Sequence, residues 1–156
     1  KWSSAPLYAF FLFLVFKKFG LKATVIVVLC AAVMITATDQ LANLFKYILF
    51  KRPRPCREQE LELLMRFVAE GCGRYGYFSA HAASSMAAAV FLGLLLKSYF
   101  KALPFVLLLW ASVVAYSRIY LGVHYPLDII TGMFFGAWIG FGMLKVNTWA
   151  QGRFIS

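Results

Sequence analysis

The chain has 156 residues, of which 62% are hydrophobic and only 14% are charged. A soluble domain carries about 25% charged residues, so this composition indicates an integral membrane protein. The apolar runs are long and do not alternate with polar residues, which excludes a membrane β-barrel and favours helices. We therefore expect an all-α membrane bundle in which residues 1–156 form a single domain.

The net charge of +10 would favour nucleic acid as the partner of a soluble protein. Here the charge divides between two membrane faces, so we expect membrane lipids as partners and no nucleic acid. Nothing in the sequence indicates an oligomeric state. The chain opens with Lys1 and an interfacial Trp2, so we expect further residues before it, including a sixth span.

Five apolar segments follow one another along the chain. A span needs about 20 residues, so the first segment is short, and the second is long enough to reach past one membrane surface. Their approximate bounds are 5–16, 23–50, 79–96, 104–119 and 126–144.

Alternating these spans places basic residues without any acidic ones on one membrane face. These residues are Lys17, Lys18, Lys22, Lys97, Lys101, Lys145 and Arg153. The other face is also basic, but four glutamates lie among its cations. The positive-inside rule makes the first face cytoplasmic. We therefore expect a protein of the inner or plasma membrane whose residues 51–77 and 118–125 face the periplasm or exterior.

The second apolar segment ends in a strongly basic cluster. Lys46 lies at the membrane surface, and Lys51-Arg52-Pro53-Arg54-Pro55 follows it. The prolines prevent a simple helical continuation and hold Arg52 and Arg54 in extended backbone. A collar for lipid head groups and a clamp for a substrate phosphate explain this cluster equally well.

The third apolar segment opens with Phe78-Ser79-Ala80-His81. Ser79 is a natural N-cap, and the free amides of Ala80 and His81 can bind an anion at the helix start. His81 would then stand beside that anion and could donate a proton to a leaving oxygen. Taken alone, this short pattern is explained better by an ordinary cap followed by an interfacial histidine.

The last cluster reads Ser117-Arg118, five residues, His124, three residues, Asp128. Residues four apart share a helix face, so Asp128 can bind one imidazole nitrogen of His124 and leave the other free to attack. Arg118 offers a planar fork suited to phosphate oxygens. A structural His–Asp pair joining two helices is the competing interpretation, although ionisable groups in membrane segments are usually functional.

In this order, the three clusters resemble the signature of the type 2 phosphatidic acid phosphatase superfamily, which includes vanadium-dependent haloperoxidases. That signature is Lys-x6-Arg-Pro, then Pro-Ser-Gly-His, then Ser-Arg-x5-His-x3-Asp. The third block is complete, whereas Phe78 and Ala80 replace the Pro and Gly of the second. In the first block, Lys46 is followed by seven residues before Arg54 and by five before Arg52. We assign the block to Arg54, which precedes the long loop, and Arg52 remains a substitute.

The resemblance implies that His124 attacks phosphorus to form a phosphohistidine, that Asp128 assists it, and that His81 protonates the leaving group. It also implies a set of phosphate ligands, namely Lys46, Arg54, Ser79, Ala80 and Arg118. It implies no metal and no other cofactor, and the sequence lacks the carboxylates and histidines of a two-metal phosphatase.

The implied function is hydrolysis of a lipid phosphate monoester or diphosphate by a membrane-embedded enzyme. Candidate substrates are phosphatidylglycerophosphate, undecaprenyl diphosphate, lipid A phosphate and phosphatidate. A lipid phosphotransferase, a haloperoxidase using vanadate, and a non-catalytic lipid-binding or transport protein are the alternatives.

Smaller patterns carry four further expectations. A polar stripe runs from Thr36 through Asp39 to Lys46 and is explained at least as well by an interhelical seam as by substrate contact, so we leave Asp39 outside the site. Three glycines form one face of the last segment, which favours close packing within the bundle over dimerisation. They are Gly132, Gly136 and Gly140.

The three cysteines divide into one buried and two loop residues. Cys30 lies in the middle of a span, where packing is its expected role. Cys56 and Cys72 share the outward loop, and a disulfide and two free thiols are equally good expectations for them.

Overall fold

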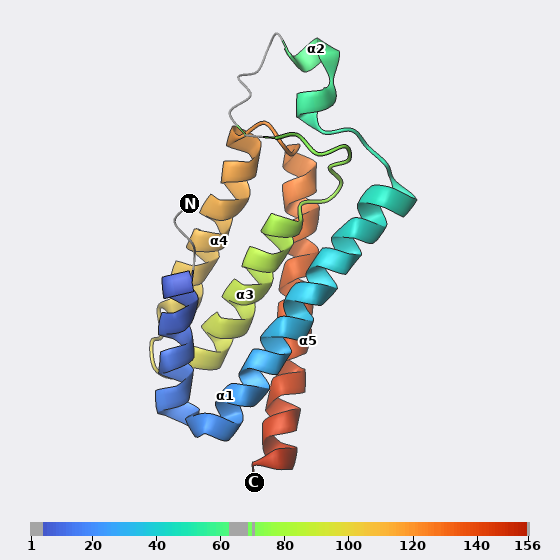
Figure 1. The fold of residues 1–156 in the computed structure, drawn as a ribbon. Coiled ribbons are helices and arrows are strands. Elements are labelled where there is room, and N and C mark those ends of the chain that lie inside the picture. The colour runs from blue at the N-terminus through green and yellow to red at the C-terminus, as the bar shows by residue number, and fades with distance from the viewer. Residues whose placement is uncertain (1–4, 63–68, 70, 156) are drawn as a thin grey trace.

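A computed structural model describes residues 5–62, 69 and 71–155, and these residues form an all-α bundle (Figure 1). Three helical stretches are long and apolar enough to cross a membrane, at Ala9–Leu49, Leu103–Tyr120 and Pro126–Phe154. The expected all-α membrane bundle is therefore confirmed. The elements are α1 (Ala5–Leu44), a π-helical turn η1 (Phe45–Leu49), a 3-10 turn η2 (Pro55–Arg57), α2 (Gln59–Glu62), α3 (Ala80–Leu96), α4 (Leu103–Tyr120) and α5 (Pro126–Phe154).

Helix α1 is made of two limbs that meet at Gly20. This residue has a φ of 77° and a ψ of 179°, a conformation that only glycine adopts without strain. In Figure 1 the chain descends along the first limb and rises again along the second. The first two predicted segments are therefore these limbs, joined by a bend of one residue rather than by a loop.

The other helices begin where the sequence predicted, and the last one ends later. Ser79 caps α3, and a proline lies in the first turn of both α4 and α5. Helix α5 runs to Phe154, beyond the predicted end at residue 144. Polar residues after Leu144 end the apolar run, but no proline interrupts the helix there, and Gln151 bonds to Asn147 one turn earlier at 2.9 Å.

Helices α3 and α5 pack closely because glycines of α5 face alanines of α3. A Cβ at Gly140 would lie 2.5 Å from the carbonyl oxygen of Ala87, and one at Gly136 would collide with the backbone of Ala83. These contacts confirm that the glycine face packs within the bundle. At the upper end of the same seam, the Ser79 amide donates to the Asp128 carbonyl oxygen at 3.1 Å. The seam thus joins the starts of α3 and α5.

The two ends of the bundle differ in character. The bend of α1 and the α3–α4 connection meet at one end, where Lys18 bonds to Ser98 and lies 4.7 Å from the ring centroid of Tyr99. Residues 50–62 and 71–79, which lie between η1 and α3 in the sequence, are at the opposite end, together with the α4–α5 turn (Figure 1). All three sequence clusters with candidate catalytic residues therefore meet at this second end.

Candidate active site

Aromatic packing fixes the entry to α3 against η1 and α5. Phe78 is fully buried, and its ring lies 5.2 Å from that of Phe45 and 5.3 Å from that of Phe135. Tyr77 joins the same cluster and its hydroxyl bonds to Thr131 at 3.1 Å. Phe78 occupies the place of the signature proline, and here it anchors the backbone that leads into Ser79.

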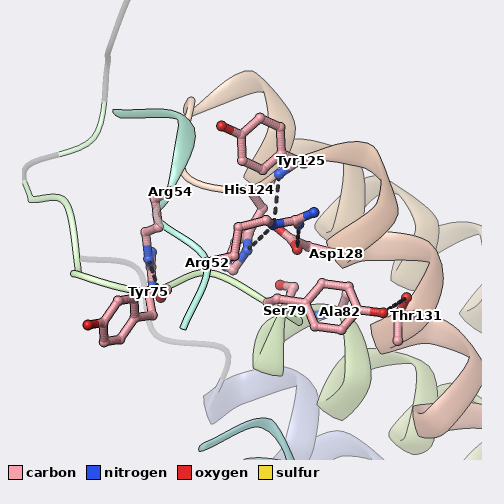
Figure 2. Close-up of polar contacts among 10 residues, drawn as sticks. Arg52, Arg54, Tyr75, Ser79, Ala82, His124, Tyr125, Asp128 and Thr131 are labelled. Carbon is pink, nitrogen blue, oxygen red and sulfur yellow. Dashed lines mark hydrogen bonds and ion pairs between the residues drawn. The ribbon is translucent and has the colours of Figure 1, made fainter. Parts of the chain in front are cut away.

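A disulfide and several hydrogen bonds hold together the two arms of the loop between η1 and α3. Cys56 and Cys72 form the disulfide, which was one of the two expectations for them. Beside it, Arg57 donates to the Cys72 carbonyl oxygen at 2.9 Å, and Arg54 Nε donates to the Tyr75 carbonyl oxygen at 3.0 Å. The second contact directs the Arg54 side chain along the returning arm (Figure 2).

The end of the bundle contains a cavity of about 500 Å³. It brings together residues from α1, η1, the loop, α3, α4 and the α4–α5 turn, which lie far apart in the sequence. Six of the eight predicted site residues line it, namely Lys46, Arg54, Ala80, His81, Arg118 and His124. Asp39, Ala69, Gly71, Leu121 and Val123 complete the lining.

The cavity holds cations that form no ion pair with a carboxylate of the described residues, although Asp39 also lines it. Lys46 is only 7% exposed, and no carboxylate of the described residues pairs with it or with Arg118. The Arg118 Nε is also buried without a hydrogen-bond partner among them. Burying unpaired charge is costly, so these side chains favour a bound anion. Two guanidinium groups and one ammonium suit a phosphate.

The π-helical turn accounts for the unusual spacing of the first block. Seven residues separate Lys46 from Arg54, one more than in the signature, and Lys46 lies within η1. A π-helical turn holds more residues than an α-helical turn, and such turns recur at functional sites. The additional residue is thus taken up in the helix, and Lys46 and Arg54 still line one cavity.

His124 is held by a buried carboxylate at the start of α5. Its Nδ1–H donates to Asp128 Oδ2 at 3.3 Å, and the Tyr125 amide donates to the same oxygen at 2.9 Å. Asp128 has no exposed surface, so it lies behind the cavity rather than in it. With Nδ1 engaged, the Nε2 lone pair of His124 is the one available to the cavity.

Arg52 completes this arrangement from the other side. Its guanidinium pairs with Asp128 Oδ1 (Figure 2). The same group lies 5.0 Å and 4.7 Å from the ring centroids of Tyr77 and Tyr125. Arg54, by contrast, lines the cavity. The two arginines of the proline-rich cluster therefore have different surroundings: Arg52 contacts the Asp128 carboxylate, and Arg54 lines the cavity.

Burial and charge both act on the imidazole of His124, which lies in the turn between α4 and α5. Burial lowers its pKa below the ordinary value, and the charges of Arg54 and Lys46 lower it further. The hydrogen bond to Asp128 acts in the opposite direction. The net effect is a lowered pKa, which keeps the ring neutral and able to act as a nucleophile at neutral pH.

Ser79 has a different place from the one predicted for a phosphate ligand. Its side chain is fully buried, and its Oγ accepts a hydrogen bond from the Ala82 amide at 3.3 Å. The hydroxyl therefore caps α3 and does not line the cavity. The amides of Ala80 and His81 have no partner among the described residues, so they remain free to bind an anion at the helix start.

Asp39 lines the cavity although the sequence patterns did not assign it to the site. Its Oδ2 accepts one long hydrogen bond, of 3.5 Å, from Asn43. The signal was the polar stripe from Thr36 to Lys46, which faces the cavity at its upper end. A stripe of this kind cannot by itself distinguish a helix contact from a substrate contact.

Comparison with known proteins gives a consistent picture. A family model described as the PAP2 superfamily matches residues 27–151. A lipid A 4'-phosphatase of Bacteroides thetaiotaomicron is 34% identical over 139 residues, covering 86% of this chain and 61% of that protein. A lipid A 4'-phosphatase of Porphyromonas gingivalis is 29% identical over 158 residues, covering 99% of this chain and 65% of that protein.

A third relative has a different named activity. An undecaprenyl-diphosphatase of Sulfolobus acidocaldarius is 38% identical over 74 residues, covering 47% of this chain and 34% of that protein. No solved structure matches the chain significantly. The chain thus spans less than two thirds of the length of each of these relatives.

Proposed function

The chain belongs to the PAP2 superfamily, and on this premise we propose that it hydrolyses a phosphate ester of a membrane lipid through a phosphohistidine on His124. One observation carries the proposal. The cavity brings together a neutral, carboxylate-held histidine, a second histidine and three cations that no described carboxylate pairs with inside it.

In the first half of the reaction, Nε2 of His124 attacks phosphorus while the bond to the lipid oxygen breaks. His81 donates its proton to that oxygen, so the lipid leaves as an alcohol. Asp128 stabilises the positive charge that the His124 ring gains. Lys46, Arg54, Arg118 and the amides at the start of α3 stabilise the charge on the phosphoryl oxygens.

In the second half, water attacks the phosphohistidine. His81, now neutral, takes the proton from this water, inorganic phosphate leaves, and His124 is restored. Lys46, Arg54 and Arg118 supply positive charge to the cavity. Among the described residues, no group of three or more His, Cys, Asp or Glu could hold a metal ion. We therefore propose a reaction that requires no metal.

The active site is proposed to face the periplasm or exterior. Two observations support this orientation. The disulfide lies beside the cavity, and disulfides persist in oxidising compartments. The basic residues without acidic neighbours lie at the opposite end of the bundle, as the positive-inside rule requires for the cytoplasmic face.

Two relatives bear the name lipid A 4'-phosphatase, which supports a phosphorylated saccharolipid as the substrate. The direct test is phosphate release by the purified chain in detergent and EDTA. Lipid A, undecaprenyl diphosphate, phosphatidylglycerophosphate and phosphatidate would be compared at equal concentration. Release that persists in EDTA and is blocked by vanadate supports the proposal. Activity that EDTA abolishes and Mg²⁺ restores would contradict it.

A further inference from the structure

A second hollow opens from the active-site cavity between the second limb of α1 and α3. It has a volume of about 360 Å³ and shares Asp39, Ala80 and His81 with the cavity. We call it the α1–α3 groove. The remaining lining residues are Ile35, Thr36, Thr38, Gln40 and Ser84. Among the described residues that line it, none is Lys or Arg, so the groove differs in charge from the cavity beside it.

The position of His81 indicates which part of the substrate the groove binds. In the proposed mechanism His81 protonates the leaving oxygen, so the group attached to that oxygen extends past His81. The shared lining residues make the groove continuous with the cavity at this point. The groove therefore receives the part of the substrate that leaves as an alcohol.

Apart from His81 and the amides at the start of α3, which the groove shares with the cavity, the polar atoms of the groove are mainly hydrogen-bond acceptors. A carboxylate only accepts, and the Thr36 hydroxyl already donates to the Ala32 carbonyl oxygen at 2.9 Å. The Ser84 hydroxyl donates to the His81 carbonyl oxygen at 3.4 Å. Gln40 can both donate and accept. A leaving group rich in hydroxyl or amide N–H groups complements this lining.

Asp39 is also exposed on a helix that spans the membrane. A charge at this position is costly in lipid unless a polar group or water accompanies it. The Asn43 contact of 3.5 Å is the one hydrogen bond that the described residues give it. The charge of Lys46 acts on this carboxylate across the cavity, but no described residue forms an ion pair with it, so the carboxylate is open to a ligand within the groove.

We propose that the α1–α3 groove binds a sugar as the leaving group and that Asp39 selects against diphosphates. The inference rests on the proposed function. In a lipid diphosphate, the retained phosphate follows the leaving oxygen and would enter the groove beside the Asp39 carboxylate. The negative charges of this phosphate and of Asp39 would repel one another, whereas a sugar hydroxyl would donate a hydrogen bond to the same carboxylate.

The test compares two substrates with the purified chain in detergent: a lipid-linked glucosamine disaccharide carrying one phosphate monoester, and undecaprenyl diphosphate. We expect the wild-type chain to have the higher kcat/KM for the saccharolipid. Asp39→Asn should reduce this preference at least about tenfold by raising turnover of the diphosphate and lowering that of the saccharolipid. Gln40→Leu should lower saccharolipid turnover alone. Ser112→Ala, an exposed hydroxyl on α4, is the matched control.

Each other outcome has a defined meaning. A preference that Asp39→Asn and Gln40→Leu leave unchanged in active protein would overturn the groove assignment while the phosphatase proposal stands. So would a wild-type chain that prefers the diphosphate. Should the wild-type chain release phosphate from neither of these substrates but from phosphatidate or phosphatidylglycerophosphate, the groove assignment alone fails. Release from none of the four lipids would overturn the proposed function, and the groove assignment with it.

Discussion

Asp128 holds His124 from behind, with Nδ1 of the imidazole 3.3 Å from a carboxylate oxygen that has no exposed surface. The second oxygen of the same carboxylate is paired with Arg52. Both carboxylate oxygens are thus engaged, and the ring has one orientation in which its free nitrogen meets the cavity. This relationship makes the neutral state of His124 the form on which activity depends.

The first prediction concerns pH. The pKa of His124 is lowered, so its neutral form persists below the ordinary histidine value of about 6.5, and the acid limb of kcat/KM should lie below that pH. Because Asp128 raises this pKa, Asp128→Asn should move the limb to still lower pH and also reduce the maximal rate strongly. Profiles of both proteins with one substrate measure the shift. A limb that moves to higher pH in the variant would contradict the role of Asp128.

A second prediction separates the two arginines of the proline-rich cluster. Arg54→Ala should lower kcat/KM by about 10²–10³-fold, because it removes a cation that stabilises the transferring phosphoryl group. Arg52→Ala should cost less and should alter the pH profile, since Arg52 acts through Asp128. Arg153→Ala, at the far end of α5, is the control. Greater damage from Arg52→Ala, with a normal pH profile, would reverse the two assignments.

The spacing of the proline-rich cluster is a feature that the sequence alone could not interpret. The three polar blocks of the chain, in their order, were enough to indicate a common anion site, and six of the eight proposed residues line one cavity. The choice between Arg52 and Arg54 depended on how many residues each helical turn holds. The turn around Lys46 is π-helical, and no local pattern distinguishes it from an α-helical turn.

Two other residues could not be placed from sequence for related reasons. For Ser79, the local sequence pattern favours a helix cap, and the family resemblance adds the role of phosphate ligand. The Ala82 amide, which donates to the Ser79 hydroxyl, supports the cap. Asp39 lies on a polar stripe whose partner is set by the angle between α1 and α3. By contrast, glycines repeated every four residues allow one outcome, close approach of another helix.

The glycine face provides a prediction about stability. Gly136→Ala should lower the melting temperature in detergent, because the added methyl group collides with the Ala83 backbone, and overpacking costs about 1–3 kcal/mol. Gly142→Ala is the matched control on the same helix, with nothing within 4 Å of the added atom. It should be neutral or stabilising, since alanine favours helix more than glycine does. Equal melting temperatures for the two variants would contradict the packing described for α3 and α5.

The disulfide should support both stability and phosphate binding. Cys56 and Cys72 are 16 positions apart, and closing such a loop stabilises by about 3 kcal/mol in the chain-entropy model. A Cys56→Ser and Cys72→Ser double variant should melt at lower temperature and have a higher KM, because Arg54 lies on the constrained arm. Cys30→Ala, which removes the buried thiol, is the control. Mass spectrometry of unreduced wild-type protein should find neither loop thiol alkylatable, and free thiols at both positions would rule out the bond.

The most direct test of the proposed function is to trap the covalent intermediate. Wild-type protein would be mixed with a lipid substrate labelled on its phosphate, quenched within milliseconds under alkaline conditions and digested for mapping of the label. We expect an acid-labile, base-stable phosphoryl group on His124, and neither label nor turnover in a folded His124→Ala variant. Phosphate release by that variant at a rate close to the wild-type rate would contradict the role of His124 as the nucleophile.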